Sequence, residues 1–327
     1  MVSDFLLSVI IPCYNCENYI NECLASVHAQ IDDDVEIIVV NDGSTDRSLE
    51  KIDSFIKNNK ERAIKVISQQ NQGISAARNT GINMASGRYL ALLDGDDVWE
   101  HTFWQKIKPI LENNNVDLIE FNANRFYHGN PDIRTPVLMV TRTGFLAIKS
   151  LRDLSDIFQR NEWFPWSRVY KRELFNKVHY PVGRNYEDVA TTPLIYIESK
   201  STYSLTDELL LYRVREGSIT NTPTSKDIDD VIFALAVFTE ILNKRHPADA
   251  NILAPAVRST YSLLRRISTN VHGYCFFNAE QARKIKSLVL PFSKTEKFSK
   301  KIKLYFLREY CLLNKIKFII NRQFSRK

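Results

Sequence analysis

Two apolar runs of the sequence end abruptly in aspartate and glycine, and this shared design constrains the fold most. Residues 35–46 read VEIIVVNDGSTD, and residues 89–97 read YLALLDGDD. The β-branched and other apolar residues of both runs are typical of buried strands. In a parallel α/β sheet the ligand crevice lies beyond the carboxyl ends of the strands, so Asp42 and Asp94 are expected to face one cleft.

The second run carries three carboxylates close together, those of Asp94, Asp96 and Asp97. Such charges repel one another unless a cation compensates them. Carboxylate oxygens are hard ligands that suit Mg²⁺ or Mn²⁺, and these ions suit a phosphate-bearing substrate. The run therefore predicts a metal-diphosphate site. The alternative is a solvated Asp-Gly turn at the end of a strand.

The first hundred residues alternate between strand-like and helix-like segments. Apolar runs at 8–11, 35–40 and 65–67 are separated by helical patterns at 17–30 and 48–58. This βαβαβ order favours a parallel sheet with right-handed crossovers. The first run is followed by PCYN, and not by the G-x-G-x-x-G of dinucleotide-binding folds, which disfavours that class.

Beyond residue 100 the pattern is less regular. It predicts a strand over 117–122 and a helix around 188–198. After a break near residue 222, continuous apolar faces predict helices over 228–244 and 250–268. These two segments indicate a small C-terminal helical region.

Composition favours a globular protein of the cytoplasm. The chain has 327 residues with 44% hydrophobic content, enough to fill a core. Its five cysteines are an odd number without framework spacing, which indicates a reducing compartment. The apolar stretch 5–11 is too short for a signal peptide, and no run is long enough to span a bilayer. We therefore expect a soluble or peripheral protein.

The net charge of +6 is unevenly distributed along the chain. Residues 294–327 hold eleven Lys and Arg against two Glu, a net charge of +9, so the remainder carries −3. A protein that binds a specific nucleic acid would not concentrate its positive charge in one terminal segment. No specific nucleic-acid partner is therefore predicted, and nonspecific contact of the basic tail with RNA stays open.

The basic terminal segment is also amphipathic if residues 298–324 are helical. Basic side chains then flank one apolar face, made of Ile302, Phe306, Tyr310, Leu313, Ile316 and Ile320. This pattern predicts an interfacial helix that binds an anionic membrane surface. The alternatives are a helix docked on its own domain or a dimer contact.

Five segments occur in the order found in the inverting family 2 glycosyltransferases, which the chain resembles. They are SVIIPCYN at 8–15, VVNDGSTD at 39–46, QNQGISAARNTGINMASGRYLALLDGDD at 70–97, and NYEDVATTPL at 185–194 followed by YRVREGSIT at 212–220. The resemblance is dense over the first hundred residues and weaker to about residue 220.

The resemblance implies an α/β fold of the GT-A type, the Rossmann-like fold of nucleotide-diphospho-sugar transferases. The catalytic domain is expected over 1–221, with a nucleotide-sugar-binding half at 1–100 and an acceptor-binding half at 101–221. The C-terminal helical region with its basic tail then covers 222–327.

By resemblance, the protein is expected to move a sugar from a UDP-sugar to a saccharide or lipid-linked acceptor in surface-polysaccharide synthesis. Its expected location is the cytoplasm, peripheral on the inner face of the cell membrane. Two alternatives remain open. One is a degenerate, non-catalytic module that binds sugar nucleotides or glycans, and the other is a sugar nucleotidyltransferase. The latter needs a glycine-rich, basic triphosphate loop near the first strand, which PCYNCEN is not.

The family pattern assigns donor contacts residue by residue. It places Pro12 and Tyr14 against the uracil, and Asp42 on the uracil N3–H, a proton that a carboxylate can accept. Asn71 and Arg78 match contacts to the base and the diphosphate. The alternatives are a packed loop aromatic for Tyr14, a turn cap for Asp42 and an ion pair with the acidic loop for Arg78.

In the family's DxD motif, Asp94 reaches the ribose and donor sugar, and Asp96 coordinates Mn²⁺ or Mg²⁺. Asp97 supports the site indirectly. Bond cleavage leaves a UDP anion, so its growing charge must be met by a divalent ion and cationic side chains.

Inversion by direct displacement requires a base that removes the proton of the acceptor hydroxyl. The matching position makes Asp188 the candidate base, with Glu187 orienting the acceptor or the base. The alternative is a helix N-terminus, where acidic residues are favoured.

Two further segments match family regions around the substrates. Arg213, Arg215 and Ser218 are expected to cover the diphosphate, and a hinge at Gly217 would permit closure. Trp166 matches a region that meets the acceptor, because aromatic faces stack on sugar rings. The alternative for this tryptophan is the core.

Overall fold

The computed structural model describes residues 5–113, 115–127, 130–214, 223–294 and 298–324. The chain forms two compact units that alternate along the sequence. Unit 1 comprises Met1–Lys149, Phe164–Gly183 and Ile195–Glu216. Unit 2 comprises Ser150–Trp163, Arg184–Leu194 and Gly217–Lys327.

Unit 1 is built on parallel strands from the first hundred residues. They are β1 (Leu7–Cys13), β2 (Val35–Asn41), β3 (Ala63–Ser68) and β4 (Tyr89–Leu92). Strand β1 pairs in parallel with both β2 and β4, and β2 pairs in parallel with β3. Every residue of β1 and β2 is buried, as expected for strands covered on both faces. The predicted parallel sheet is confirmed.

Later strands extend this sheet with mixed polarity. The described sheet runs β3-β2-β1-β4-β9-β6-β10-β5, with β7 paired to β6 and β8 to β10. Strand β9 is antiparallel to β4 and β6, whereas β10 is parallel to β6. The added strands are β5 (Val98–Trp99), β6 (Leu118–Tyr127), β7 (Asn130–Val137), β8 (Gly144–Ala147), β9 (Arg168–Lys171) and β10 (Ser201–Val214).

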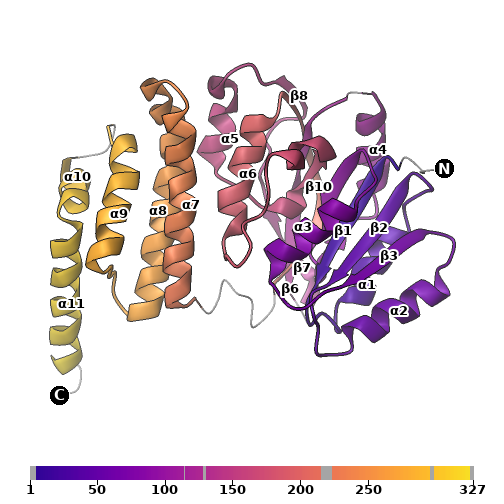
Figure 1. Ribbon diagram of the computed structural model, residues 1–327, viewed down its shortest axis with the longest axis horizontal. Coiled ribbons are helices and arrows are strands. Elements are labelled where there is room, and N and C mark those ends of the chain that lie inside the picture. Colours follow the sequence, from indigo (N-terminus) through magenta and orange to yellow (C-terminus); the bar gives the residue numbers. More distant parts are fainter. Residues whose placement is uncertain (1–4, 114, 128–129, 215–222, 295–297, 325–327) are drawn as a thin grey trace. The chain divides into compact units, whose positions relative to one another are not determined.

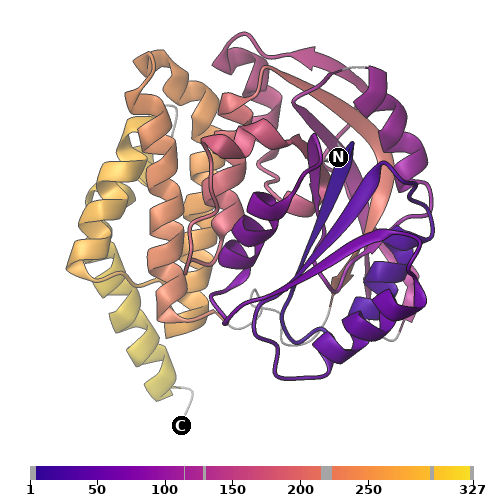
Figure 2. The ribbon, with the colours of Figure 1, turned by 45° about the vertical axis from the view of Figure 1, so that its right-hand side comes forward.

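Helices cover both faces of the parallel strands (Figures 1 and 2). On one face, α1 buries its apolar stripe in a core that includes Leu7, Val9 and Ile11 of β1. On the other face, α3 packs against β1 and β2. The unit 1 helices are α1 (Ile20–His28), α2 (Ser48–Asn58), α3 (Ile74–Met84) and α4 (Phe103–Asn113).

Unit 2 is helical apart from its connections. Helices α7, α8 and α9 lie side by side in both ribbon views, and α5 packs on α8 (Figures 1 and 2). The Phe158 ring lies edge-on to Trp163 at 5.4 Å and to Phe238 at 6.4 Å, between ring centroids. Its helices are α5 (Ser155–Arg160), α7 (Ser225–Asn243), α8 (Ala250–His272), α9 (Ala279–Val289), α10 (Phe298–Tyr305) and α11 (Leu307–Phe324), and α6 (Glu187–Glu198) begins in this unit and ends in unit 1.

The helices predicted over 228–244 and 250–268 correspond to α7 and α8, and these predictions are confirmed. All five cysteines are buried and free. Among the helices that the structure describes, none combines the length and the apolar character that crossing a membrane requires.

Candidate active site

The loops after β1 and β4 meet at the carboxyl ends of these strands. Ile10 of β1 is paired with Leu92 of β4, so these two parallel strands end at the same edge of the sheet. Gly95 lies in the loop after β4, and a Cβ atom added to it would lie 3.0 Å from the Pro12 carbonyl oxygen. Glycine therefore allows the loop of the DxD motif to lie on the backbone at the end of β1.

The Asp42 carboxylate, which follows β2, holds the segment after β3 at this edge of the sheet. Asp42 is 2% exposed, and its oxygens accept hydrogen bonds from the backbone N–H of Gln72 at 3.0 Å and of Gly73 at 2.8 Å. The amide of Gln69 donates to it as well, at 2.8 Å. The turn-stabilising alternative for Asp42 is thus present in the structure. Its contact with uracil stays a prediction.

The neighbouring residues bring the loops after β2 and β3 together. Gly43 has φ +70°, and a Cβ atom added to it would lie 2.8 Å from the backbone nitrogen of Asn71. Asn71 itself is exposed, and its side-chain oxygen accepts a hydrogen bond from the Gly73 N–H at 3.2 Å. Tyr14, beyond β1, is 47% exposed, so its ring is accessible to a flat base.

Arg78 links α3 to the acidic loop. Its guanidinium donates a hydrogen bond to Asp94 at 2.8 Å and lies 5.3 Å from the centroid of the Tyr180 ring. Arg78 is 2% exposed, whereas Asp94 is partly exposed. The predicted alternative of an ion pair with the acidic loop is therefore confirmed. A diphosphate contact by Arg78 stays a prediction.

Asp97 is a fully buried carboxyl group next to two partly exposed ones. One of its oxygens accepts a hydrogen bond from the Arg213 N–H at 2.8 Å, and the other has no hydrogen-bond partner among the described residues. Burial raises the pKa of Asp97 well above its ordinary value, and the carboxylates of Asp96 and Asp94 raise it further. The loop therefore concentrates negative potential that a cation would relieve.

These residues fit a divalent cation held jointly with a substrate. Within the described ranges, no cluster of three or more His, Cys, Asp or Glu side chains is arranged to hold a metal ion. Mg²⁺, however, usually takes one or two carboxylates plus substrate phosphates, and a full protein cage is not required. The carboxylate donors of Asp94 and Asp96 and the unpartnered oxygen of Asp97 are consistent with such a site.

Arg213 lies under the acidic loop in this structure. Its guanidinium donates to the Asp96 carbonyl at 2.7 Å and to the Glu22 carboxylate at 2.6 Å, and it lies 4.3 Å from the Phe126 ring centroid. Sequence reasoning missed Glu22, because nothing local connects it to a residue 191 positions away. A diphosphate contact by Arg213 stays a prediction, and Arg215 and Ser218 lie outside the described residues.

Trp166 is part of the core of unit 1. It is 4% exposed, and its ring stacks on Phe164 at 4.9 Å and on Tyr212 at 5.3 Å, between centroids. The core alternative is present in the structure, and an acceptor contact stays a prediction.

In unit 2, the predicted base lies at the start of α6. Glu187 and Asp188 occupy its first turn, and Asp188 accepts a hydrogen bond from the Val189 N–H at 2.8 Å. Tyr186 immediately before them has φ +57°, a conformation that costs free energy for a bulky residue. Such strain is often found at functional sites, although it does not identify one alone.

Buried carboxylates of α7 hold this strained segment in place. Arg184 donates to Asp230 at 2.9 Å, and the side chain of Asn185 donates to Asp227 at 2.7 Å. The Asn185 backbone N–H donates to Asp230 at 3.0 Å. Both aspartates are buried, and sequence reasoning did not identify either of them.

Comparisons with known proteins agree with the sequence resemblance. The sequence model of Glycosyl transferase family 2 matches residues 8–184. The uncharacterized glycosyltransferase EpsJ of Bacillus subtilis is 33% identical over 233 residues, which are 69% of this chain and 66% of EpsJ, just under two thirds. Glycosyltransferase GlyA of Streptococcus pneumoniae is 30% identical over 77% of this chain, but only 37% of GlyA is covered.

A solved structure shows the same fold. S. aureus TarS 1–349, crystallised in complex with UDP-GlcNAc, matches with a TM-score of 0.68 and 22% identity, over 86% of this chain and 79% of that chain. The GT-A fold that the sequence predicts is therefore confirmed. With the family match spanning more than half of its residues, the chain belongs to glycosyl transferase family 2.

Proposed function

We propose that the protein is an inverting hexosyl- or N-acetylhexosaminyltransferase that uses a UDP-sugar. Its acceptor would be a saccharide or lipid-linked glycan of a bacterial surface polysaccharide, such as a capsule, O-antigen or lipooligosaccharide. Family membership supports glycosyl transfer. The UDP-GlcNAc complex of TarS, a fold relative, supports a nucleotide-sugar donor.

One observation carries the donor assignment most directly. Arg78 on α3 forms an ion pair with Asp94. Asp94 lies in the same loop as Asp96 and the buried Asp97, at the carboxyl ends of β1 and β4. Asp96 is the proposed ligand of Mn²⁺ or Mg²⁺, and Asp94 would meet the ribose and donor sugar. When bound, the cation supplies positive charge that stabilises the departing diphosphate.

Asp188 is the proposed general base, with Glu187 orienting it or the acceptor. The acceptor oxygen forms a bond to the anomeric carbon while the bond from that carbon to the UDP oxygen breaks. Asp188 takes the hydroxyl proton, and UDP leaves with the bonding electrons. No enzyme nucleophile is required, because a single displacement already inverts the anomeric centre.

The proposal includes a place in the cell. We expect the protein in the cytoplasm, peripheral on the inner face of the membrane, where a lipid-linked acceptor would be accessible. The +9 charge of residues 294–327 supports this location, because cytoplasmic leaflets carry anionic lipids.

Nucleotide binding tests the donor site directly. Thermal unfolding would be followed with UDP, GDP, CMP and a panel of UDP-sugars, each with and without Mn²⁺. We expect UDP to raise the melting temperature most and Mn²⁺ to increase the shift. Asp96→Asn should abolish the effect of Mn²⁺ and the transfer, whereas Asp188→Asn should keep the UDP shift and lose transfer. No shift with any nucleotide would reject the donor site, and full transfer by Asp188→Asn would reject the base.

A further inference from the structure

A cationic cavity lies within unit 2, and its lining includes none of the residues assigned to the proposed active site. It has a volume of about 240 Å³ and is lined by residues of α8 and of the segments from α9 to α11. Four lining residues are basic, and no lining residue is acidic. The four are Arg258, Arg265, Lys301 and Lys303.

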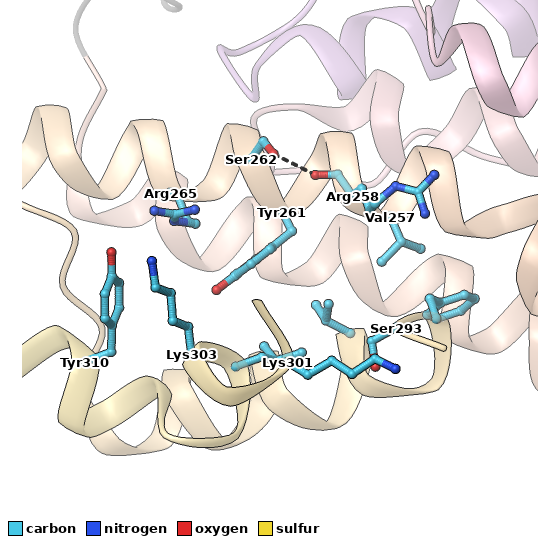
Figure 3. Close-up of a pocket in the computed structure, with 12 residues that line it drawn as sticks. Val257, Arg258, Tyr261, Ser262, Arg265, Ser293, Lys301, Lys303 and Tyr310 are labelled. Carbon is cyan, nitrogen blue, oxygen red and sulfur yellow. Dashed lines mark hydrogen bonds between the residues drawn. The ribbon is translucent and has the colours of Figure 1, made fainter. Parts of the chain in front are cut away.

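The polar ends of four lining side chains point into one end of this cavity. Figure 3 shows the Arg265 guanidinium, the Lys303 amine and the hydroxyls of Tyr261 and Tyr310 directed toward the same region. The Lys303 amine lies 5.3 Å from the centroid of the Tyr310 ring. An ordinary tyrosine hydroxyl, with a pKa of about 10, is already a hydrogen-bond donor at neutral pH, and burial raises the pKa of Tyr261 further. Cations and hydroxyl donors together suit a phosphate group.

Part of the cavity wall is apolar. Val257, Val289, Phe292 and Leu304 form this part, beside the serine and basic side chains of the lining. One water takes about 30 Å³ in the liquid, so this volume can hold a phosphate with part of its ester. The lining therefore fits an anion that carries an apolar substituent better than it fits a free inorganic ion.

The adjoining α11 has apolar residues on two sides. One side is docked, because Leu307 and Cys311 are buried and α11 packs against α9. The other side is exposed although it is apolar, and Ile316 at its centre is 53% exposed. At about 100° per residue these exposed side chains form one stripe, roughly opposite the docked side. They are Leu312, Leu313, Ile316, Ile319 and Ile320.

We infer that α10 and α11 bind an anionic phospholipid, with its headgroup phosphate in the cationic cavity and the exposed stripe of α11 in the acyl region. Exposed Ile302 and Phe306 would extend the apolar contact beside the cavity. This inference rests on the proposed membrane location, but it does not depend on the donor or the metal.

Charge favours a lipid over a second copy of the chain as the partner of the stripe. Two copies meeting through this surface would bring together two segments of +9 each. An anionic bilayer offers the opposite charge and an apolar interior at the same time. Docking on the protein's own domain is already provided by the buried side of α11.

Co-sedimentation of the full chain with vesicles tests the inference. We expect binding to phosphatidylcholine vesicles that contain phosphatidylglycerol, and little binding to phosphatidylcholine alone. Leu313→Ser with Ile316→Ser should release the protein if the stripe is inserted. Binding that is unaffected by these substitutions, or by omission of the anionic lipid, would overturn the inference.

A matched pair of variants tests the cavity separately from diffuse charge. Arg265→Gln with Lys303→Gln removes two charges from the cavity lining, and Arg308→Gln with Lys317→Gln removes one Arg and one Lys outside the lining, all four residues being exposed. If the attraction is diffuse, each charge removed weakens binding about fivefold, and both pairs lose the same amount. A phosphate held in the cavity predicts a clearly larger loss for the cavity pair, which persists at high salt. Equal losses would overturn the headgroup site.

Two controls distinguish a bound lipid headgroup from a soluble anion, and membrane binding from donor binding. Thermal stabilisation by inorganic phosphate alone, lost in the cavity pair, would show a site for soluble anions and overturn the lipid assignment. The UDP shift is measured on the same samples. Failure to bind vesicles with the UDP shift intact rejects only this inference, whereas vesicle binding without a UDP shift rejects only the proposed donor.

Discussion

A single residue, Arg213, connects three parts of the proposed donor site. Its backbone N–H contacts Asp97, its guanidinium contacts the Asp96 carbonyl, and its second partner is Glu22 on α1. It therefore fixes the loop that carries the proposed metal ligand. In this arrangement Arg213 is a positioning residue, which would act on the proposed cation through the backbone of Asp96.

Replacing Arg213 by Gln should weaken metal binding more than nucleotide binding. The variant loses the charged hydrogen bond to the Asp96 carbonyl and the ion pair with Glu22, whose side chain is 56% exposed, so that the pair itself contributes only about 0.2–1 kcal/mol. We expect the midpoint of a Mn²⁺ titration, read from the UDP thermal shift, to move to higher concentration. Glu22→Gln keeps the arginine on the Asp96 carbonyl and should have the smaller effect. An unchanged Mn²⁺ midpoint with a raised donor KM would instead assign Arg213 to the diphosphate.

At the scale of the elements, Glu36 joins four segments of the sheet. It lies on β2 with no exposed surface, and its carboxylate accepts hydrogen bonds from Ser8 on β1 at 2.7 Å and from Lys65 on β3 at 2.8 Å. The N–H of Ser86, before β4, donates to it at 2.7 Å. Burial raises the pKa of Glu36, but these donors outweigh burial and lower it below its ordinary value.

The lowered pKa predicts how stability depends on pH. Because the folded-state pKa of Glu36 lies below the unfolded value of about 4.3, its contribution is complete above that value and is lost as the pH falls through the folded pKa. Glu36→Gln should lower the free energy of unfolding by about 1–3 kcal/mol at neutral pH, with a smaller difference in acid. Urea unfolding across this pH range measures it.

The control for this measurement is Glu50→Gln, which changes an exposed glutamate of α2. Its free energy of unfolding should follow that of the wild type at every pH. If Glu36→Gln had the same free energy of unfolding as the wild type at every pH, the carboxylate would have no role in holding the strands together.

The local sequence pattern predicted the strands that are continuous and buried. It did not predict strands whose formation depends on pairing with distant segments. Strands β1 and β2 were predictable because every residue is apolar or buried in a short run. Strand β10 was not, because it mixes polar and apolar residues and its register with β6 shifts twice. Asp227 looks like a helix-capping residue, since it forms a capping box with Thr224, and nothing local reveals its bond to Asn185.

The same limit applies to the candidate site. The DxD loop and the loop after β2 could be placed at one edge because parallel strands share their carboxyl ends. The ion pair between Arg213 and Glu22 could not be predicted, because it depends on how all the strands between these two residues are ordered in the sheet. Sequence therefore predicted that the motifs proposed to bear the chemistry share one edge of the sheet, and the structure added the side chains that hold them there.

At the scale of the whole molecule, the two units alternate along the chain. Segments 150–163 and 184–194 precede the last strand but cluster with the C-terminal helices. Phe158 packs against Phe238 of α7, and Asn185 bonds to Asp227 and Asp230. The proposed base segment thus depends on helices that follow the family match in sequence.

A chain cut at residue 221 should therefore fold poorly, although the motifs of the resemblance precede that point. The fragment 1–221 would leave Phe158 without Phe238 and the segment around Asn185 without its buried carboxylates, and losing a large aromatic contact alone costs about 3–5 kcal/mol. We expect a broad, low-temperature unfolding transition and binding of a hydrophobic dye. The fragment 1–293, which keeps α7 to α9, should unfold cooperatively. If 1–221 unfolded as sharply as the full chain, segments 150–163 and 184–194 would not need the C-terminal helices.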